Sequence, residues 1–243
     1  MREKRLVVAL ELVTELRERS GGWHPDPVTA AALAGLGGAD GCSLGLRSES
    51  SRSQERDARL LRETLQRGFG LATPPDAALL RLVLDVRPDW VLFVERGGIG
   101  SATSSLDSRR GVALDLTTQS ALLRELVSGL DDAKLAGHLC VQPELEHVKA
   151  AHRLGASGLC LDTTRYAHAP EPESELRRIE DAAKLATKLG LSVAAGGALD
   201  YDNVRGLAQI AELRSIHVGR AVIARALLIG LERAVQEMRS LIG

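Results

Sequence analysis

The sequence predicts one α/β domain, residues 1–243, folded as a (β/α)8 TIM barrel with a closed sheet of eight parallel strands. Eight short apolar segments alternate with amphipathic segments along the chain. No shift in composition marks a domain boundary, and 243 residues suit one barrel. An open, doubly wound sheet is the alternative architecture.

The expected strands are short and almost continuously apolar, rather than alternating between apolar and polar residues. This pattern is typical of parallel strands that are buried on both faces. The eight expected strands are Leu6–Leu10, Cys42–Leu46, Phe69–Ala72, Trp90–Val94, Leu135–Val141, Gly158–Leu161, Leu191–Ala195 and Ser215–Val218.

Three helices are clearly indicated between and after these strands. Pro27–Leu36 opens with Asp-Pro, a capping residue followed by a proline in the first turn. Glu173–Leu189 carries one apolar stripe and stops at Gly190. The last helix is expected from about Arg220 to the end of the chain, with apolar positions at Ile223, Leu227, Leu231, Val235, Met238 and Leu241.

Composition argues against several classes of partner. The formal net charge is -1, so no global field attracts nucleic acid or an anionic membrane. Aromatic residues make up 2%, too few for the stacking surfaces of single-strand binders. We therefore expect neither nucleic acid nor a membrane as a partner.

The cysteines and the first residues indicate a cytoplasmic protein. Cys42, Cys140 and Cys160 are odd in number and far apart, with neither zinc spacing nor a disulfide framework. The histidines form no recognisable ligand set, so we expect no metal and no cofactor. Glu11 interrupts the apolar run near the start, which is too short for a signal peptide or a membrane span.

Two glycine-bearing turns, Ala194–Leu199 and His217–Leu227, suggest a phosphate site. Barrels that bind phosphorylated ligands often build the anion site after strands seven and eight, at a helix N-terminus. Glycine lets the backbone approach the anion, and arginine adds a charge-assisted contact. The candidate phosphate-binding residues are Gly196, Gly197, Gly219 and Arg220. The alternative is that these glycines serve only tight turns.

A Gly- and Ser-rich segment, residues 97–111, is the one long loop. It follows the fourth expected strand, on the side where barrel enzymes place lids. We interpret it as a possible lid, or alternatively as a disordered surface loop.

Six segments carry a resemblance to a known family. They are PDPVTAA (Pro25–Ala31), GADG (Gly38–Gly41), LR (Leu46–Arg47), ERDARLLRETL (Glu55–Leu65), LGLSVAAGGALDYDNV (Leu189–Val204) and VGRAVIARALLIGLERAVQEM (Val218–Met238). In this order and register the chain resembles pyridoxine 5′-phosphate synthase from about Leu6 to Met238. The resemblance implies a barrel that joins 1-deoxyxylulose 5-phosphate to 3-amino-2-oxopropyl phosphate and closes a pyridine ring, with acid–base groups and anion sites.

The chain departs from the family pattern where the resemblance implies catalytic groups. The Asn-x-Asp-His motif of the first strand reads Ala9-Leu10-Glu11-Leu12, and Ser48–Arg52 replaces an acidic, arginine-rich segment. The family's loop glutamate aligns near Thr103. Single catalytic side chains of the family align with Gly45, Ala72, Gly197 and Arg220, whereas Arg47 is retained. Because alanine and glycine transfer no proton, the family reaction should be lost or changed; one lost acid–base group costs about 10²–10⁴-fold in rate.

Three functions remain open. The first is a divergent barrel that binds a phosphorylated small molecule, with Glu11, Arg47 and Asp162 as candidate catalytic residues. Further polar residues at expected strand ends are Glu95, Arg96, Gln142 and Thr163. The second is a non-catalytic barrel that acts as an oligomeric interaction scaffold. The third is a functional synthase with a rearranged site.

The resemblance also implies a homo-oligomer, because the family assembles through helices added to the barrel. The family arginine that reaches a neighbouring active site aligns with Ser20, so a shared site is not expected here.

Overall fold

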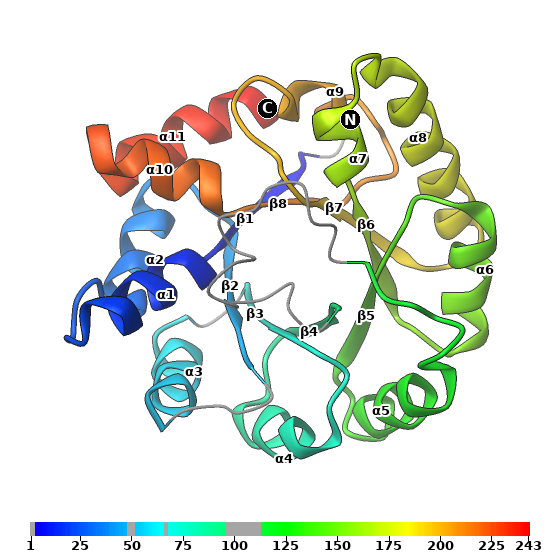
Figure 1. Ribbon diagram of the computed structural model, residues 1–243, viewed down its shortest axis with the longest axis horizontal. Helices are drawn as coiled ribbons and strands as arrows, with labels where there is room; N and C mark the ends of the chain where they lie inside the picture. Colours follow the sequence, from blue (N-terminus) through cyan, green and yellow to red (C-terminus); the bar gives the residue numbers. More distant parts are fainter. Residues whose placement is uncertain (1–2, 48–51, 66–67, 96–112) are drawn as a thin grey trace.

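Eight parallel strands form a closed barrel at the centre of the molecule. The structure is a computed structural model that describes residues 3–47, 52–65, 68–95 and 113–243. Strands β1 to β8 pair in sequence order, and β8 pairs with β1 to close the barrel (Figure 1). The predicted (β/α)8 barrel is confirmed, and the open sheet is excluded.

The observed strands lie where the apolar segments predicted them, within one or two residues at each end. Strands β2, β3 and β6 are buried at every position, as expected for strands covered on both faces. The strands are β1 (Arg5–Ala9), β2 (Gly41–Gly45), β3 (Phe69–Thr73), β4 (Trp90–Phe93), β5 (Ala136–Val141), β6 (Gly158–Asp162), β7 (Ser192–Gly196) and β8 (Ser215–Val218).

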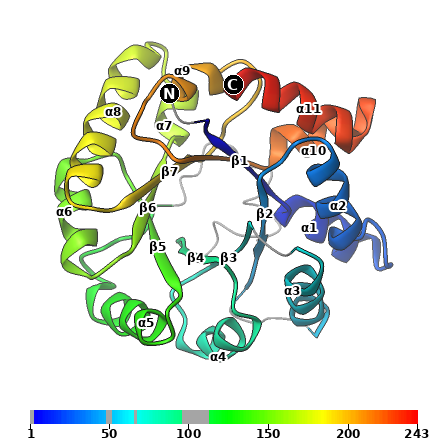
Figure 2. The same ribbon diagram turned by 180° about the vertical axis from the view of Figure 1, so that it is seen from behind.

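Helices surround this barrel on all sides, as the views from its two ends show (Figures 1 and 2). They are α1 (Glu11–Ser20), α2 (Pro27–Leu36), α3 (Arg52–Thr64), α4 (Ala77–Val86), α5 (Ser120–Asp132), α6 (Leu145–Arg153), α7 (Thr164–His168), α8 (Pro172–Lys188), α9 (Val204–Ala208), α10 (Arg220–Ile229) and α11 (Leu231–Ile242).

Local signals account for the helices that the sequence predicted. The Asp26 side chain caps α2 by accepting a hydrogen bond from the Thr29 backbone N–H at 2.8 Å, and Pro27 occupies the first turn. Helix α8 runs from Pro172 to Lys188, one residue earlier at each end than predicted. In contrast, α1 begins after Leu10 without a side-chain cap, and no local pattern predicted this helix.

The prediction of one long final helix is wrong. Gly230 has φ 85°, a left-handed conformation that ends α10 and begins α11. The two helices pack against each other as a pair. Because α10 turns away at Gly230, Leu227 leaves the predicted apolar stripe and is 78% exposed. Val235 and Met238 on α11 are buried as expected.

The strands divide the interior into two apolar regions. One is the main core between the strands and the outer helices. The other fills the barrel itself, where Trp90 packs on a cluster made of Ala72, Leu92, Val94, Cys140, Cys160 and Ala194. Since side chains alternate along a strand, this second cluster identifies which residues of each strand face inward.

The predicted lid, residues 97–111, lies outside the described residues. Among the helices that are described, none is both long and apolar enough to cross a membrane.

Candidate functional site

The carboxyl ends of the strands meet at one end of the barrel, where enzymes of this fold place their sites. We call this end the barrel mouth. On five neighbouring strands, β7, β8, β1, β2 and β3, the residues facing inward there are Gly196, Gly219, Ala9, Gly45 and Ala72. Farther around the barrel, Gln142 directly follows β5 and Asp162 is the last residue of β6. One side of the mouth is therefore lined by backbone and methyl groups, and another by polar side chains.

Asp162 is a buried hub on the polar side. It is 1% exposed. Its Oδ1 accepts from the Thr164 backbone N–H at 2.9 Å, and its Oδ2 accepts from the Gln142 side chain and the Ala113 backbone N–H, both at 3.3 Å. The Gln142 Oε1 atom is buried and has no hydrogen-bond partner among the described residues. Asp162 thus orients Gln142.

Close packing dictates glycine at position 197. Gly197 has φ 118°, which side chains other than glycine rarely adopt. A Cβ there would lie 2.7 Å from Asp162 Oδ1 and 2.9 Å from Thr164 Oγ1. The Thr163 hydroxyl also donates to the Gly197 carbonyl at 2.6 Å. A histidine at this position, as the family pattern has, does not fit this arrangement.

The candidate phosphate residues come together at the ends of β7 and β8. A Cβ at Gly219 would lie 3.0 Å from Ala9 Cβ, so close packing explains this glycine as well. Of the hydrogen bonds formed among the described residues, none uses the N–H of Gly197, Ala198 or Gly219. Gly219 is also the N-cap of α10 and provides no side-chain cap. These N–H groups, with Arg220 in the first turn of α10, can bind an anion.

Glu11 lies at the start of α1, directly after β1. The Ser43 hydroxyl, on the neighbouring strand β2, lies 3.5 Å from Glu11 Oε1. Burial raises the pKa of Glu11 to about 7, although hydrogen bonds from its own backbone N–H and from Ser43 act in the opposite direction. A carboxyl with this pKa can both release and accept a proton near neutral pH.

Arg47, the basic residue retained from the family pattern, is held by another protein group. Its guanidinium forms an ion pair with Glu18 of α1, and Glu18 also accepts from Gln54 at 3.3 Å. Arg47 therefore binds protein at the side of the mouth, and its use on a ligand requires competition with Glu18.

One further candidate, Glu95, lies at the edge of this arrangement. Glu95 accepts a hydrogen bond from the Gln119 side chain at 3.2 Å, away from Glu11 and Asp162 in the strand order. Arg96 and Thr103 lie outside the described residues, as does the segment 48–51. Sequence reasoning missed Ser43, although two-residue alternation from Arg47 along β2 would have placed it on the inward face.

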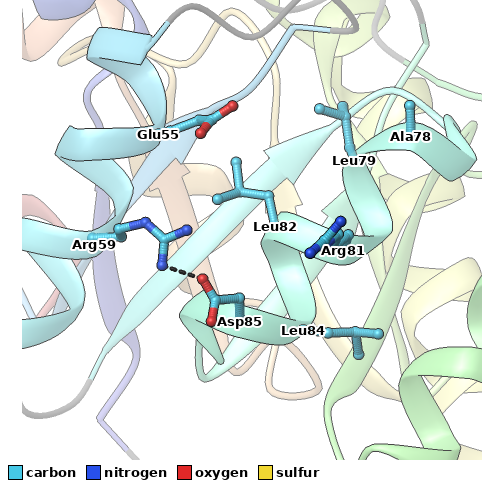
Figure 3. Close-up of a pocket in the computed structure, with 8 residues that line it drawn as sticks. All are labelled: Glu55, Arg59, Ala78, Leu79, Arg81, Leu82, Leu84 and Asp85. Atoms are coloured by element: carbon cyan, nitrogen blue, oxygen red, sulfur yellow. Dashed lines mark hydrogen bonds and ion pairs between the residues drawn. The ribbon is translucent and has the colours of Figure 1, made fainter.

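A groove on the outer ring lies elsewhere, between α3 and α4 (Figure 3). It measures about 610 Å³, and an ion pair between Arg59 and Asp85 bridges it. Its lining comes from these two helices alone, with Glu55 and Arg59 on α3 and the remaining residues on α4. Among the described residues, no group of three or more His, Cys, Asp or Glu side chains is placed to hold a metal ion.

The fold and the mouth together define a class: a single (β/α)8 barrel with its candidate site at the carboxyl ends of the strands. Comparison with known proteins identifies the family. The profile described as "Pyridoxal phosphate biosynthesis protein PdxJ" matches residues 6–243, and the chain belongs to this family. The family resemblance expected from the sequence is confirmed.

Curated relatives match the chain over nearly its whole length. Pyridoxine 5′-phosphate synthase of Geotalea daltonii is 36% identical over 241 residues, covering 98% of each chain. The synthase of Geobacter sulfurreducens is 36% identical over 242 residues, again covering 98% of each.

Solved structures at low identity show the same fold. Phosphoribosyl anthranilate isomerase from Thermus thermophilus matches with TM-score 0.59 and 14% identity, over 98% of both chains. A 4-hydroxy-2-oxoglutarate aldolase/2-deydro-3-deoxyphosphogluconate aldolase matches with TM-score 0.65 and 14% identity, over 99% of this chain and 96% of the other.

Proposed function

We propose that this barrel binds a phosphorylated small molecule at its mouth, with the phosphate held between the ends of β7 and β8. The observation that carries the proposal is the group of unpaired N–H donors at Gly197, Ala198 and Gly219, beside the uncapped start of α10. The helix dipole contributes about 0.3–1 kcal/mol for an anion there. A charge-assisted bond from Arg220 contributes about 1.5–3 kcal/mol.

Calorimetric titration of inorganic phosphate and of 1-deoxyxylulose 5-phosphate tests this proposal. We expect inorganic phosphate to bind in the high micromolar to millimolar range, and Arg220→Ala to weaken it about 10-fold or more. Arg233→Ala, an arginine of α11 whose side chain is 72% exposed, is the matched control and should change nothing. Absence of binding, or equal binding by wild type and Arg220→Ala, contradicts the proposed site.

We further propose that ring closure as performed by the synthases is lost or changed in this chain. Gly45 and Ala72 face the mouth without acid–base groups, and the packing around Gly197 leaves no room for a histidine. Each missing acid–base group costs about 10²–10⁴-fold in rate.

An active synthase with a rearranged site is the second candidate function. It is favoured by 36% identity, over nearly the full length, to proteins named pyridoxine 5′-phosphate synthase. Expression in a vitamin B6 auxotroph that lacks its own synthase separates the two. We expect no rescue; growth without added vitamin would establish the second candidate.

The exposed apolar surface supports a homo-oligomer, and it would equally serve an interaction scaffold. Six of the seven large apolar side chains that are exposed among the described residues lie on α1, α2, α10 and the loop after α1, which adjoin each other in Figures 1 and 2. They are Leu16, Trp23, Leu33, Leu36, Leu227 and Leu228. Such a concentration of apolar surface is typical of an interface.

Light scattering at micromolar concentration tests the oligomer. We expect wild type to be larger than a monomer, and Leu227→Asp/Leu228→Asp to dissociate it. Leu145→Asp, at an exposed leucine of α6, is the control. A monomeric wild type contradicts this part of the proposal.

The three cysteines are free thiols, which supports the cytoplasmic location expected from the sequence.

A further inference from the structure

The Glu11 carboxylate forms weaker contacts with the protein than the carboxylates of Asp162 and Glu18 do. Asp162 accepts three hydrogen bonds, and Glu18 pairs with Arg47. Among the described residues, the Glu11 carboxylate accepts hydrogen bonds from the Ser43 hydroxyl, at 3.5 Å, and from its own backbone N–H. Ser43 is itself 5% exposed and faces inward from β2. The carboxyl therefore has hydrogen-bonding capacity that the protein does not use.

Within the part of the chain that the structure describes, no counter-charge fixes the protonation state of Glu11. The elements packed against α1 are α2, α10 and β2, and α3 is joined to it by the ion pair between Arg17 and Asp57. Helix α2 carries no ionisable side chain, α10 carries Arg220 and Arg225, and β2 carries the Cys42 thiol, whose pKa is raised to about 12 by burial and by Glu11. On α1 itself the charged groups are Glu15, Arg17, Glu18 and Arg19. No ion pair joins Glu11 to any of the described residues.

The place of Glu11 brings it next to the anion site. Strand β1 lies between β8 and β2, so Glu11 is one strand away from Gly219 and the start of α10. Neighbouring strands are about 4.8 Å apart. The inward-facing residues at the ends of these two strands are Ala9 and Gly219, and a Cβ at Gly219 would lie 3.0 Å from that of Ala9. A three- to five-carbon chain attached to a phosphate at α10 reaches Glu11.

We propose that Glu11 is the acid–base residue of the barrel mouth, and that it removes a proton from the carbon next to the carbonyl of a bound ketose phosphate. The C–H electron pair forms the carbon–carbon double bond of the enolate, and the carbonyl π electrons move to oxygen. The proton passes to the Glu11 carboxylate and returns to carbon when the step reverses. The step needs no oxidant, reductant or second substrate. This role rests on the proposed phosphate site.

Deuterium exchange into 1-deoxyxylulose 5-phosphate, followed by proton NMR in D2O, measures this step directly. We expect wild type to exchange the hydrogens next to the carbonyl, with a rate that rises with pH and reaches half its maximum near pH 7. Glu11→Gln keeps the shape of the side chain but accepts no proton, so exchange should fall about 100-fold or more.

Two controls distinguish a catalytic from a structural role. Ser43→Ala removes a hydrogen bond that lowers the pKa of Glu11, so its exchange profile should move to higher pH, which a purely structural role of Glu11 would not produce. Glu11→Gln should still bind inorganic phosphate in calorimetry, because the β7–β8 donors are untouched. If the sugar phosphate binds but wild type and Glu11→Gln exchange alike, or not at all, the role of Glu11 is refuted and the phosphate site stands. If neither phosphate binds to wild type, the phosphate site fails and the role of Glu11 fails with it.

Discussion

At the scale of single residues, the barrel mouth is shaped as much by missing side chains as by those present. Gly197 shows this most clearly, because Asp162 and Thr164 fill the space where its Cβ would lie. The absence of a side chain at position 197 and the packing of Asp162 are therefore linked. Gly197→His would displace Asp162, which orients Gln142.

Gly197→Ala should destabilise the fold by about 1–3 kcal/mol through overpacking, in addition to backbone strain at φ 118°. Gly190→Ala is the matched control, since Gly190 also has positive φ, 81°, but its Cβ would meet nothing within 4 Å. Urea denaturation of the two variants measures the difference. A loss at Gly197 no larger than that at Gly190 would show that this packing is not tight.

Glu11 should make wild-type stability depend on pH. Its folded-state pKa, about 7, exceeds the usual 4.5, so the folded protein holds the proton more tightly than the unfolded chain. The stabilisation is complete below pH 4.5 and is lost as pH rises through 7, up to about 3 kcal/mol. Glu11→Gln lacks this dependence. Parallel curves of unfolding free energy against pH for the two proteins would contradict the assigned pKa.

At the scale of elements, buried charge fixes how the first helices sit on the barrel. Arg17 of α1 forms an ion pair with Asp57 of α3, and their side chains are 5% and 0% exposed. The pair locks α1 beside α3, on the side where Glu18 holds Arg47. The orientation of the strand-end residues Glu11 and Arg47 therefore depends on contacts between helices.

Asp57→Ala should cost about 3–5 kcal/mol, because it leaves the Arg17 charge buried without its partner. The double variant Arg17→Met/Asp57→Leu removes both charges and should recover most of that loss. Thermal denaturation compares the two. Asp85→Ala breaks the half-exposed pair with Arg59 (Figure 3) and should leave the midpoint nearly unchanged. A small effect of Asp57→Ala would mean that the pair is solvated.

At the scale of the whole molecule, the barrel interior contains two histidines. His138 lies on β5 and His217 lies on β8. Burial lowers the pKa of each to about 4, and for His217 the neighbouring His138 adds to the effect. Ser215 and the tilted ring of Trp90 surround His217. The closed barrel is therefore built to hold both rings uncharged.

Acid should lower the free energy of unfolding of this barrel. Between pH 6.5 and 4 the unfolded chain protonates both histidines and the folded protein does not, so stability falls as pH falls, by about 3 kcal/mol per histidine at the lower limit. The Glu11 effect has the opposite sign, so the measurement belongs in the Glu11→Gln background. There, His138→Gln should flatten the acid limb of the stability curve. An unchanged limb would show that other groups cause acid unfolding.

The sequence by itself determined the barrel: eight strands within one or two residues, α2 in full, and the family. These features depend on local apolar runs, capping residues and punctuating glycines, which act over a few neighbouring residues. The tertiary structure alone decided that Gly230 splits the last helix, that Arg47 is held by Glu18, and that Asp162 excludes a side chain at Gly197. It also decided that Glu11 lies partly buried beside Ser43. Each of these depends on residues distant in the chain, because burial and close approach are set by the packing of one element on another.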